Sequence, residues 1–229
     1  LFGDKLHTYT IVNAINDGNV LPFRIDYINT MKSKDEVDDK EVRAIDREKA
    51  LAAPERIRAV TKYILAHFDQ KTMRSKAYSL KGQRVLGFNS MFAVASIPAC
   101  MAYYEEFRRQ LREAGRSLTI ATIFSYAANE DDPEDALPDE DFDTAGLDRT
   151  SRDFLDDAIA DYNAQFHTNF STGGDSFQNY YKDLSQRMKK REIDLLIVVN
   201  MFLTGFDATT LNTLWVDKNL KYHGLIQAF

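Results

Sequence analysis

A short segment near the end of the chain carries groups that suit contact with a phosphate or a sugar. An apolar run over residues 193–199 precedes it, and the segment itself reads Thr204-Gly205-Phe206-Asp207. Gly205 would let the backbone approach a phosphate closely, Thr204 offers a hydroxyl and an amide, and Asp207 offers a carboxylate for a ribose hydroxyl or a partner arginine. A plain turn in which Asp207 caps the next element is the simpler explanation of four residues alone.

Other chemistry finds less support in the sequence. None of the ten glycines fits the G-x-x-x-x-G-K-[ST] pattern that cradles phosphates. The single cysteine excludes a multi-cysteine metal site, and the four histidines lack metal-ligand spacing. Residues 35–38 (DEVD) mimic a DEAD-type acidic box, and residues 38–40 (DDK) mimic the end of a nuclease motif. No apolar strand precedes either, so both are interpreted as a solvated charge run, and no metal site is expected.

The elements that would position the segment form an α/β pattern. Four apolar runs predict buried strands, over residues 90–95, 118–124, 193–199 and 213–217, and helical periodicity separates the first three. Helix starts are expected at Pro54, after a Ser96 cap, and at a Thr150-x-x-Asp153 capping box. Two β-like runs are expected near residues 8–12 and 21–28. Buried strands separated by helices indicate a mainly parallel sheet covered on both faces. We therefore expect a three-layer α/β domain over residues 85–229, with residues 1–84 as an N-terminal extension packed on it.

The net charge of -6 arises from one local block. Residues 130–148 contain ten acidic and no basic residues, whereas the rest of the chain has 25 acidic and 29 basic residues. We interpret residues 127–150 as an acidic insertion. The rest of the chain is mildly basic, so its charge does not exclude a nucleic-acid partner. The basic side chains within residues 71–84 and 187–191 could contact DNA phosphates or could simply be solvated surface. The sequence contains no run of about 18 apolar residues, the length that a membrane span requires, so a cytoplasmic location is expected.

Three segments of the sequence resemble a known family. Residues 194–207 (DLLIVVNMFLTGFD), 214–218 (LWVDK) and 221–229 (KYHGLIQAF) closely resemble the second RecA-like motor domain of the R subunit of type I restriction enzymes. These are superfamily 2 DNA translocases with a P-loop NTPase type of fold. Residues 6–23 are similar to the family's junction between its two motor domains. The chain lacks an initiator methionine and stops within an expected helix, so we expect it to be part of a larger polypeptide.

The resemblance implies roles for individual residues. Thr204, Gly205, Phe206 and Asp207 would form helicase motif V, which links the DNA backbone to the nucleotide cleft. Gln227 would begin motif VI, whose arginines follow in the family and are absent here. The strand at residues 90–96 takes the place of motif IV. Ser96 and Asn200 are therefore further candidates for DNA backbone contacts.

The implied function is that of a fragment of an ATP-dependent DNA translocase and endonuclease subunit. ATP and Mg²⁺ would bind mainly to the first motor domain, which this chain lacks, and the nuclease would lie in a separate domain. The fragment would therefore contain no catalytic residue and be inactive alone. Partners would be double-stranded DNA and the modification and specificity subunits, with no membrane. The alternatives are a non-catalytic RecA-like interaction module and a superfamily 2 helicase of another branch.

Overall fold

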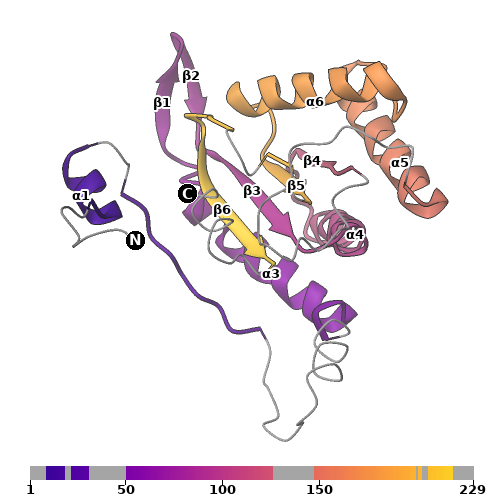
Figure 1. Cartoon of the computed structure of the whole chain (residues 1–229), viewed down its shortest axis with the longest axis horizontal. Coiled ribbons are helices and arrows are strands. Elements are labelled where there is room, and N and C mark those ends of the chain that lie inside the picture. The colour runs from indigo at the N-terminus through magenta and orange to yellow at the C-terminus, as the bar shows by residue number, and fades with distance from the viewer. Residues whose placement is uncertain are drawn as a thin grey trace, which may run out of the picture. The chain divides into compact units, whose positions relative to one another are not determined.

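The computed structural model describes residues 9–18, 22–30, 50–125, 147–199, 201–202 and 206–218. The chain divides into two units, residues 1–38 and residues 39–229 (Figure 1). Each unit is described by itself. Asn200, Thr204, Gly205 and Gln227 lie outside the described residues, as does the expected acidic insertion except for residues 147–150. The boundary expected between residues 84 and 85 stays a prediction.

In the described part of the first unit, residues 9–18 and 22–30, there is one short helix, α1 (Ile11–Asn16). Thr10 caps it: the Thr10 hydroxyl accepts a hydrogen bond from the Asn13 backbone N–H at 3.3 Å, and the Asn13 side chain accepts one from the Thr10 N–H at 2.9 Å. The β-like run expected near residues 8–12 is therefore wrong, because this reciprocal cap stabilises a helical turn against the β preference of its branched residues. Residues 22–30 form no strand.

The second unit is built on a parallel sheet of four strands, in the order β4-β5-β3-β6. The strands are β3 (Asn89–Val94), β4 (Ile120–Ile123), β5 (Leu195–Val198) and β6 (Leu211–Asp217). β5 pairs with β3 and β4, and β3 pairs with β6, each in parallel register. Every residue of β3 and β5 is buried, so both faces of the central sheet are covered. The four expected strands are confirmed.

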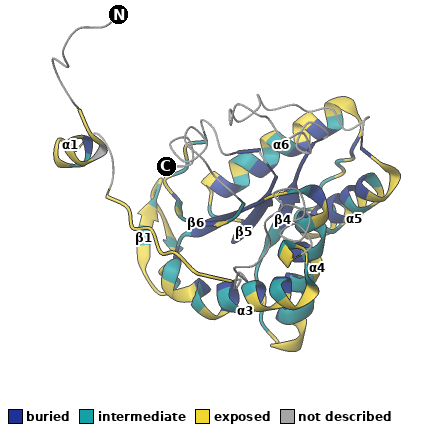
Figure 2. Ribbon diagram, turned by 60° about the horizontal axis from the view of Figure 1, so that its bottom comes forward, coloured by how far each residue is buried: buried dark blue, intermediate teal, exposed yellow. Residues whose placement is uncertain are grey.

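Helices cover the sheet on both sides (Figure 2). On one side lie α3 (Pro54–Lys71) and α4 (Ile97–Glu113), where the Phe92 ring of β3 meets the Tyr103 ring of α4 at 4.8 Å. On the other side, the carbonyl of Met188 in α6 (Gly174–Lys189) accepts a hydrogen bond from the Asn89 side chain at 2.6 Å. The expected three-layer RecA-like α/β class is confirmed.

A further helix, α5 (Arg149–Phe166), begins earlier than expected. Its cap is Asp148, whose carboxylate accepts hydrogen bonds from the Ser151 backbone N–H at 3.1 Å and the Ser151 hydroxyl at 2.6 Å. Thr150 therefore lies inside the helix, and the expected Thr150–Asp153 capping box is wrong. A carboxylate caps at least as well as a threonine hydroxyl and also interacts favourably with the helix dipole.

One supersecondary element was not expected from the sequence. An antiparallel hairpin of β1 (Ala77–Leu80) and β2 (Gln83–Leu86) precedes β3. In Figure 1 it projects beyond the beginning of β3, at the amino edge of the parallel sheet. No helix among the described residues is long and apolar enough to cross a membrane.

Candidate functional site

The candidate segment follows the carboxyl end of β5, a central strand of the sheet. β5 and the neighbouring Val199 are buried, and the chain leaves the strand through Met201 and Phe202, each 2% exposed. In open parallel sheets, ligands bind beyond the carboxyl ends of the strands. Phe206 and Asp207, the described part of the segment, belong to the connection that runs from this edge back along α6 to the amino edge of the sheet, where Thr210 donates to the Met188 carbonyl at 2.7 Å.

An aromatic cluster holds this segment against α6. The Phe202 ring lies 4.5 Å from the Tyr181 ring, and the Phe206 ring meets Phe202 edge-on at 4.9 Å. The Lys189 ammonium lies 5.5 Å from the centre of the Phe206 ring. Phe202 and Phe206 precede and follow residues 203–205 in the sequence, and each of them contacts a side chain of α6. Phe206 thus packs on its neighbours and positions the segment.

Phe202 adopts an unusual backbone conformation at this position. Its φ is +61°, in the left-handed region that costs a bulky residue on the order of 1–3 kcal/mol. Burial of its ring between Tyr181 and Phe206 offsets that cost. Backbone strain that packing maintains is concentrated at binding sites, which supports the assignment of this bend as functional.

Asp207 is the most exposed of the candidate residues that the structure describes. Its side chain is exposed, and no hydrogen bond or ion pair engages it among the described residues. It does not cap a following helix, because the next element is the strand β6. The simpler explanation of the segment, in which Asp207 is a cap, is therefore not supported.

Ser96 has the structural role that the sequence predicts, as a helix cap. Its hydroxyl oxygen accepts a hydrogen bond from the Ala99 N–H at 3.3 Å, which confirms it as the cap of α4. A hydroxyl that accepts one bond retains its own proton for donation. Ser96 follows the carboxyl end of β3, the strand beside β5, so it lies at the same sheet edge as the end of β5. Its contact with a DNA phosphate stays a prediction.

The end of β6 carries an ion pair that sequence reasoning missed. Arg56 of α3 binds Asp217 through both terminal nitrogens, one of them at 2.8 Å, and the Tyr103 hydroxyl donates to the same carboxylate at 2.5 Å. Burial and then the Asp217 charge raise the pKa of Tyr103, which keeps its proton on the oxygen. The signal for this ion pair in the sequence was Asp217, a single acidic residue at the end of an apolar strand. The network joins α3, α4 and β6 and leaves Asp217 internally paired.

A second buried carboxylate, Asp194, lies at the opposite, amino end of β5. Arg74 binds it with two nitrogens, one of them at 3.2 Å, Arg191 binds it at 2.7 Å, and the Thr119 N–H donates to it at 2.9 Å. Arg74 and Arg191, which belong to the two basic segments considered for phosphate contacts, thus bind Asp194 instead. Arg187 is likewise held, by Asp183 at 2.7 Å and Glu192 at 2.6 Å.

The Asp194 cluster predicts a dependence of stability on pH. Burial alone would raise the pKa of Asp194, but the hydrogen bonds from Arg74, Thr119 and Arg191 outweigh it and lower that pKa. A carboxyl whose pKa is lower in the folded state contributes stability above its unfolded pKa of about 3.9, and this contribution is lost as the pH falls below that value. We expect the Asp194→Asn variant to lose on the order of 2 kcal/mol at pH 6, from weakened charged hydrogen bonds. Urea unfolding at pH 6 and pH 3 should show a smaller pH dependence for this variant; an unchanged dependence would contradict the assignment.

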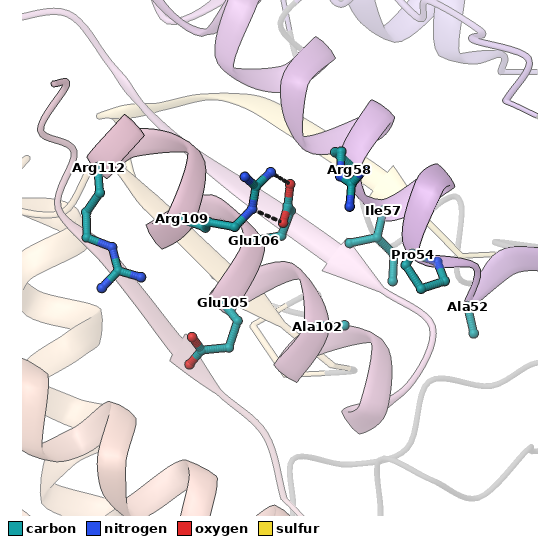
Figure 3. A pocket seen from close by; sticks show the side chains of 9 residues that line it. All are labelled: Ala52, Pro54, Ile57, Arg58, Ala102, Glu105, Glu106, Arg109 and Arg112. Atoms are coloured by element: carbon teal, nitrogen blue, oxygen red, sulfur yellow. Dashed lines mark hydrogen bonds and ion pairs between the residues drawn. The ribbon is translucent and has the colours of Figure 1, made fainter. Parts of the chain in front are cut away.

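A shallow pocket of about 330 Å³ lies between α3 and α4 (Figure 3). Its wall combines apolar side chains with Glu106 and Arg109, whose two hydrogen bonds of 2.8 and 2.6 Å pair them with each other. The pair neutralises its own charge. Neither Ser96 nor the segment after β5 lines the pocket, so we assign no nucleotide or DNA contact to it.

Comparison with known proteins identifies the family. Residues 86–229 match the model of the type I restriction enzyme subunit R domain 3. The SauCOLORF180P endonuclease subunit of a Staphylococcus aureus type I restriction enzyme is 46% identical over 235 residues, which cover all of this chain and 23% of that protein. The corresponding SsaAORF53P subunit from Staphylococcus saprophyticus is 43% identical over 233 residues, with the same coverage. The chain thus spans about a quarter of the length of these relatives. It belongs to the R-subunit family of type I restriction enzymes.

Proposed function

We propose that this chain is the part of an ATP-driven double-stranded DNA translocase that supplies one wall of the nucleotide cleft and one DNA contact. Family membership supports the class of enzyme. The observation that carries the assignment of the site is the strained and aromatically anchored bend that follows β5, with Asp207 exposed beside it. Phe202 and Phe206 are held by packing, and groups that are already ordered bind a ligand without a large ordering cost.

The chemistry of the segment fits a grip on sugar and phosphate. The Thr204 hydroxyl and the backbone at Gly205 would contact a phosphate, with Ser96 and Asn200 as neighbouring donors. Asp207 would accept a hydrogen bond from a ribose hydroxyl of ATP, since the sugars within a DNA strand have no free hydroxyl, or from an arginine of the facing domain. Phosphate contacts carry no sequence information, so such a grip lets a duplex pass through regardless of its sequence.

The remaining parts of the reaction would come from elsewhere in the parent protein. We assign the binding of ATP and Mg²⁺ mainly to the first motor domain and the arginine function of motif VI to the region after Gln227. Phosphoryl transfer needs these groups together, so this chain alone has no complete catalytic site. When ATP is bound and hydrolysed, the cleft between the two motor domains would close and open and so move the DNA. The modification and specificity subunits would set where on the DNA this begins.

Substitution in the full-length R subunit tests this proposal. Asp207→Ala and Thr204→Ala should each reduce the rate of DNA translocation at least tenfold, measured by displacement of a triplex-forming strand. Because Asp207 is exposed, its substitution should change the free energy of unfolding by no more than about 0.5 kcal/mol. The matched control is Asp157→Ala, which removes an exposed carboxylate from α5 and should leave translocation unchanged.

Two results would contradict the proposal. Unchanged translocation in the Asp207→Ala and Thr204→Ala variants would favour a non-catalytic interaction module. Separation of duplex strands by the full-length protein, in place of their joint movement, would favour a helicase of another superfamily 2 branch.

A further inference from the structure

The hairpin formed by β1 and β2 is tight and regular. Lys81 and Gly82 connect the strands with φ angles of +49° and +83°, the combination that defines a type I′ turn. This turn matches the natural twist of two paired strands and fixes their register. Tyr78 faces Val85 across the ladder, and Ser79 faces Arg84. The two strands thus form a narrow ribbon with one partly buried and one exposed face.

The base of this ribbon is fixed to the parallel sheet. Gly87 has a φ of +62°, and a Cβ placed on it would lie 2.8 Å from the Arg74 Cα, so only glycine fits there. Arg191 donates to the Gly87 carbonyl at 3.0 Å, and both arginines bind the buried Asp194. The Tyr78 ring stacks on Phe88 at 4.7 Å. The hairpin is therefore a rigid arm, since its base is secured by charges and rings.

The arm is positively charged and unneutralised. No acidic residue occurs between Asp69 and Glu105. Lys76, Lys81 and Arg84 are exposed, and the part of the chain that the structure describes offers none of them an ion pair. Beside Arg84 the exposed face carries Ala77, Ser79 and, at the base of the hairpin, Leu86, which is 54% exposed. A narrow ribbon with several exposed cations can approach a DNA backbone closely or enter the major groove.

We propose that this hairpin is a second contact for the duplex, which binds phosphates through Lys76, Lys81 and Arg84. The inference rests on the proposed function and adds a site to it. β3 begins next to the hairpin (Figure 1), and Ser96 follows its last residue, Val94, by two positions. The six residues of β3 span about 20 Å, at roughly 3.3 Å per residue, so the base of the hairpin and Ser96 lie about that far apart and Lys81 at the turn lies further away. Contacts at both edges of the sheet would keep the duplex attached while the bend after β5 releases it.

The test uses the full-length R subunit and a duplex of about 30 base pairs of arbitrary sequence. The variant Lys76→Gln/Lys81→Gln/Arg84→Gln removes the three charges. The matched control, Arg58→Gln/Lys62→Gln/Arg112→Gln, removes three exposed charges from α3 and α4. Fluorescence anisotropy at several salt concentrations gives the affinity and its salt dependence. We expect the hairpin variant to bind at least tenfold more weakly at about 0.1 M salt, and its log–log salt slope to be reduced by about 2 to 3.

Further measurements separate this inference from its alternatives. The variant Lys76→Arg/Lys81→Arg should retain the affinity, because it keeps the charge, and urea unfolding should show that all variants fold. A hairpin variant that binds DNA like the control would overturn the inference while leaving the proposed function intact. Loss of assembly with the partner subunits at unchanged DNA affinity would overturn it in favour of a protein interface. Absence of DNA binding by the unsubstituted protein would refute the proposed function itself.

Discussion

Replacement of Asp217 by alanine is expected to destabilise the chain by about 3–5 kcal/mol, the usual cost of leaving a buried charge without its partner. Asp217 and Arg56 are only 14% and 10% exposed at their side chains, and Arg56 also lies 3.3 Å from the Tyr103 hydroxyl. The substitution therefore removes the carboxylate that binds both the guanidinium and the phenol, whereas the Leu51 carbonyl, which accepts a hydrogen bond from Arg56 at 3.2 Å, remains. Urea unfolding of the 229-residue chain measures the loss.

Two comparisons make this result specific to the buried pair. The double variant Arg56→Met/Asp217→Leu removes both charges and should be more stable than Asp217→Ala, because no uncompensated charge remains. The exposed pair of Arg149 and Asp153, whose side chains are 94% and 67% exposed, is the surface control. Asp153→Ala should cost less than about 1 kcal/mol. An Asp217→Ala variant no less stable than Asp153→Ala would show that the network of Arg56, Tyr103 and Asp217 does not stabilise the fold.

Phe202 provides the second large effect, through both its ring and its backbone. Removal of a buried phenylalanine ring ordinarily costs about 3–5 kcal/mol, and Phe202 is 2% exposed. Because its φ is +61°, glycine should be the better of the two small replacements. We expect Phe202→Gly to be about 1 kcal/mol more stable than Phe202→Ala, measured by urea unfolding.

The control for this prediction is Phe107, a buried ring in the interior of α4. There the order should reverse, since glycine in a helix costs about 1 kcal/mol relative to alanine. If glycine were the worse replacement at both positions, the left-handed conformation at Phe202 would be wrong. The bend that follows β5 would then lose its main structural support.

The arrangement of the sheet follows from a pattern that is visible in the sequence. Residues 195–198 are four consecutive apolar residues, and such a run is satisfied only when both faces of a strand are covered. The Ser96 cap and the helix start at Pro54 were also predictable, because each depends on one residue and its immediate neighbours. Local rules sufficed for these elements.

Other features depend on competition between alternative helix caps, or on contacts between residues that are far apart in the sequence. Asp148 and Thr150 were both acceptable helix caps, and only the structure decides between them. The β1–β2 hairpin was missed because its turn uses Lys81 in a left-handed conformation that lysine rarely adopts. The pairing of Arg56 with Asp217 joins residues 161 positions apart, which no spacing rule reveals. For the candidate site, the sequence predicted the segment, whereas its anchoring by Tyr181 required the structure.

A photo-crosslink at position 207 tests the central claim most directly. A benzophenone side chain would be introduced at this exposed position in the full-length R subunit, with the same group at exposed position 157 of α5 as the control. The protein would be irradiated on duplexes of unrelated sequence with a non-hydrolysable ATP analogue present. If the bend after β5 lies against the DNA backbone, position 207 should crosslink to every duplex and position 157 to none. DNA binding by the protein with no more crosslinking at position 207 than at position 157 would contradict the account.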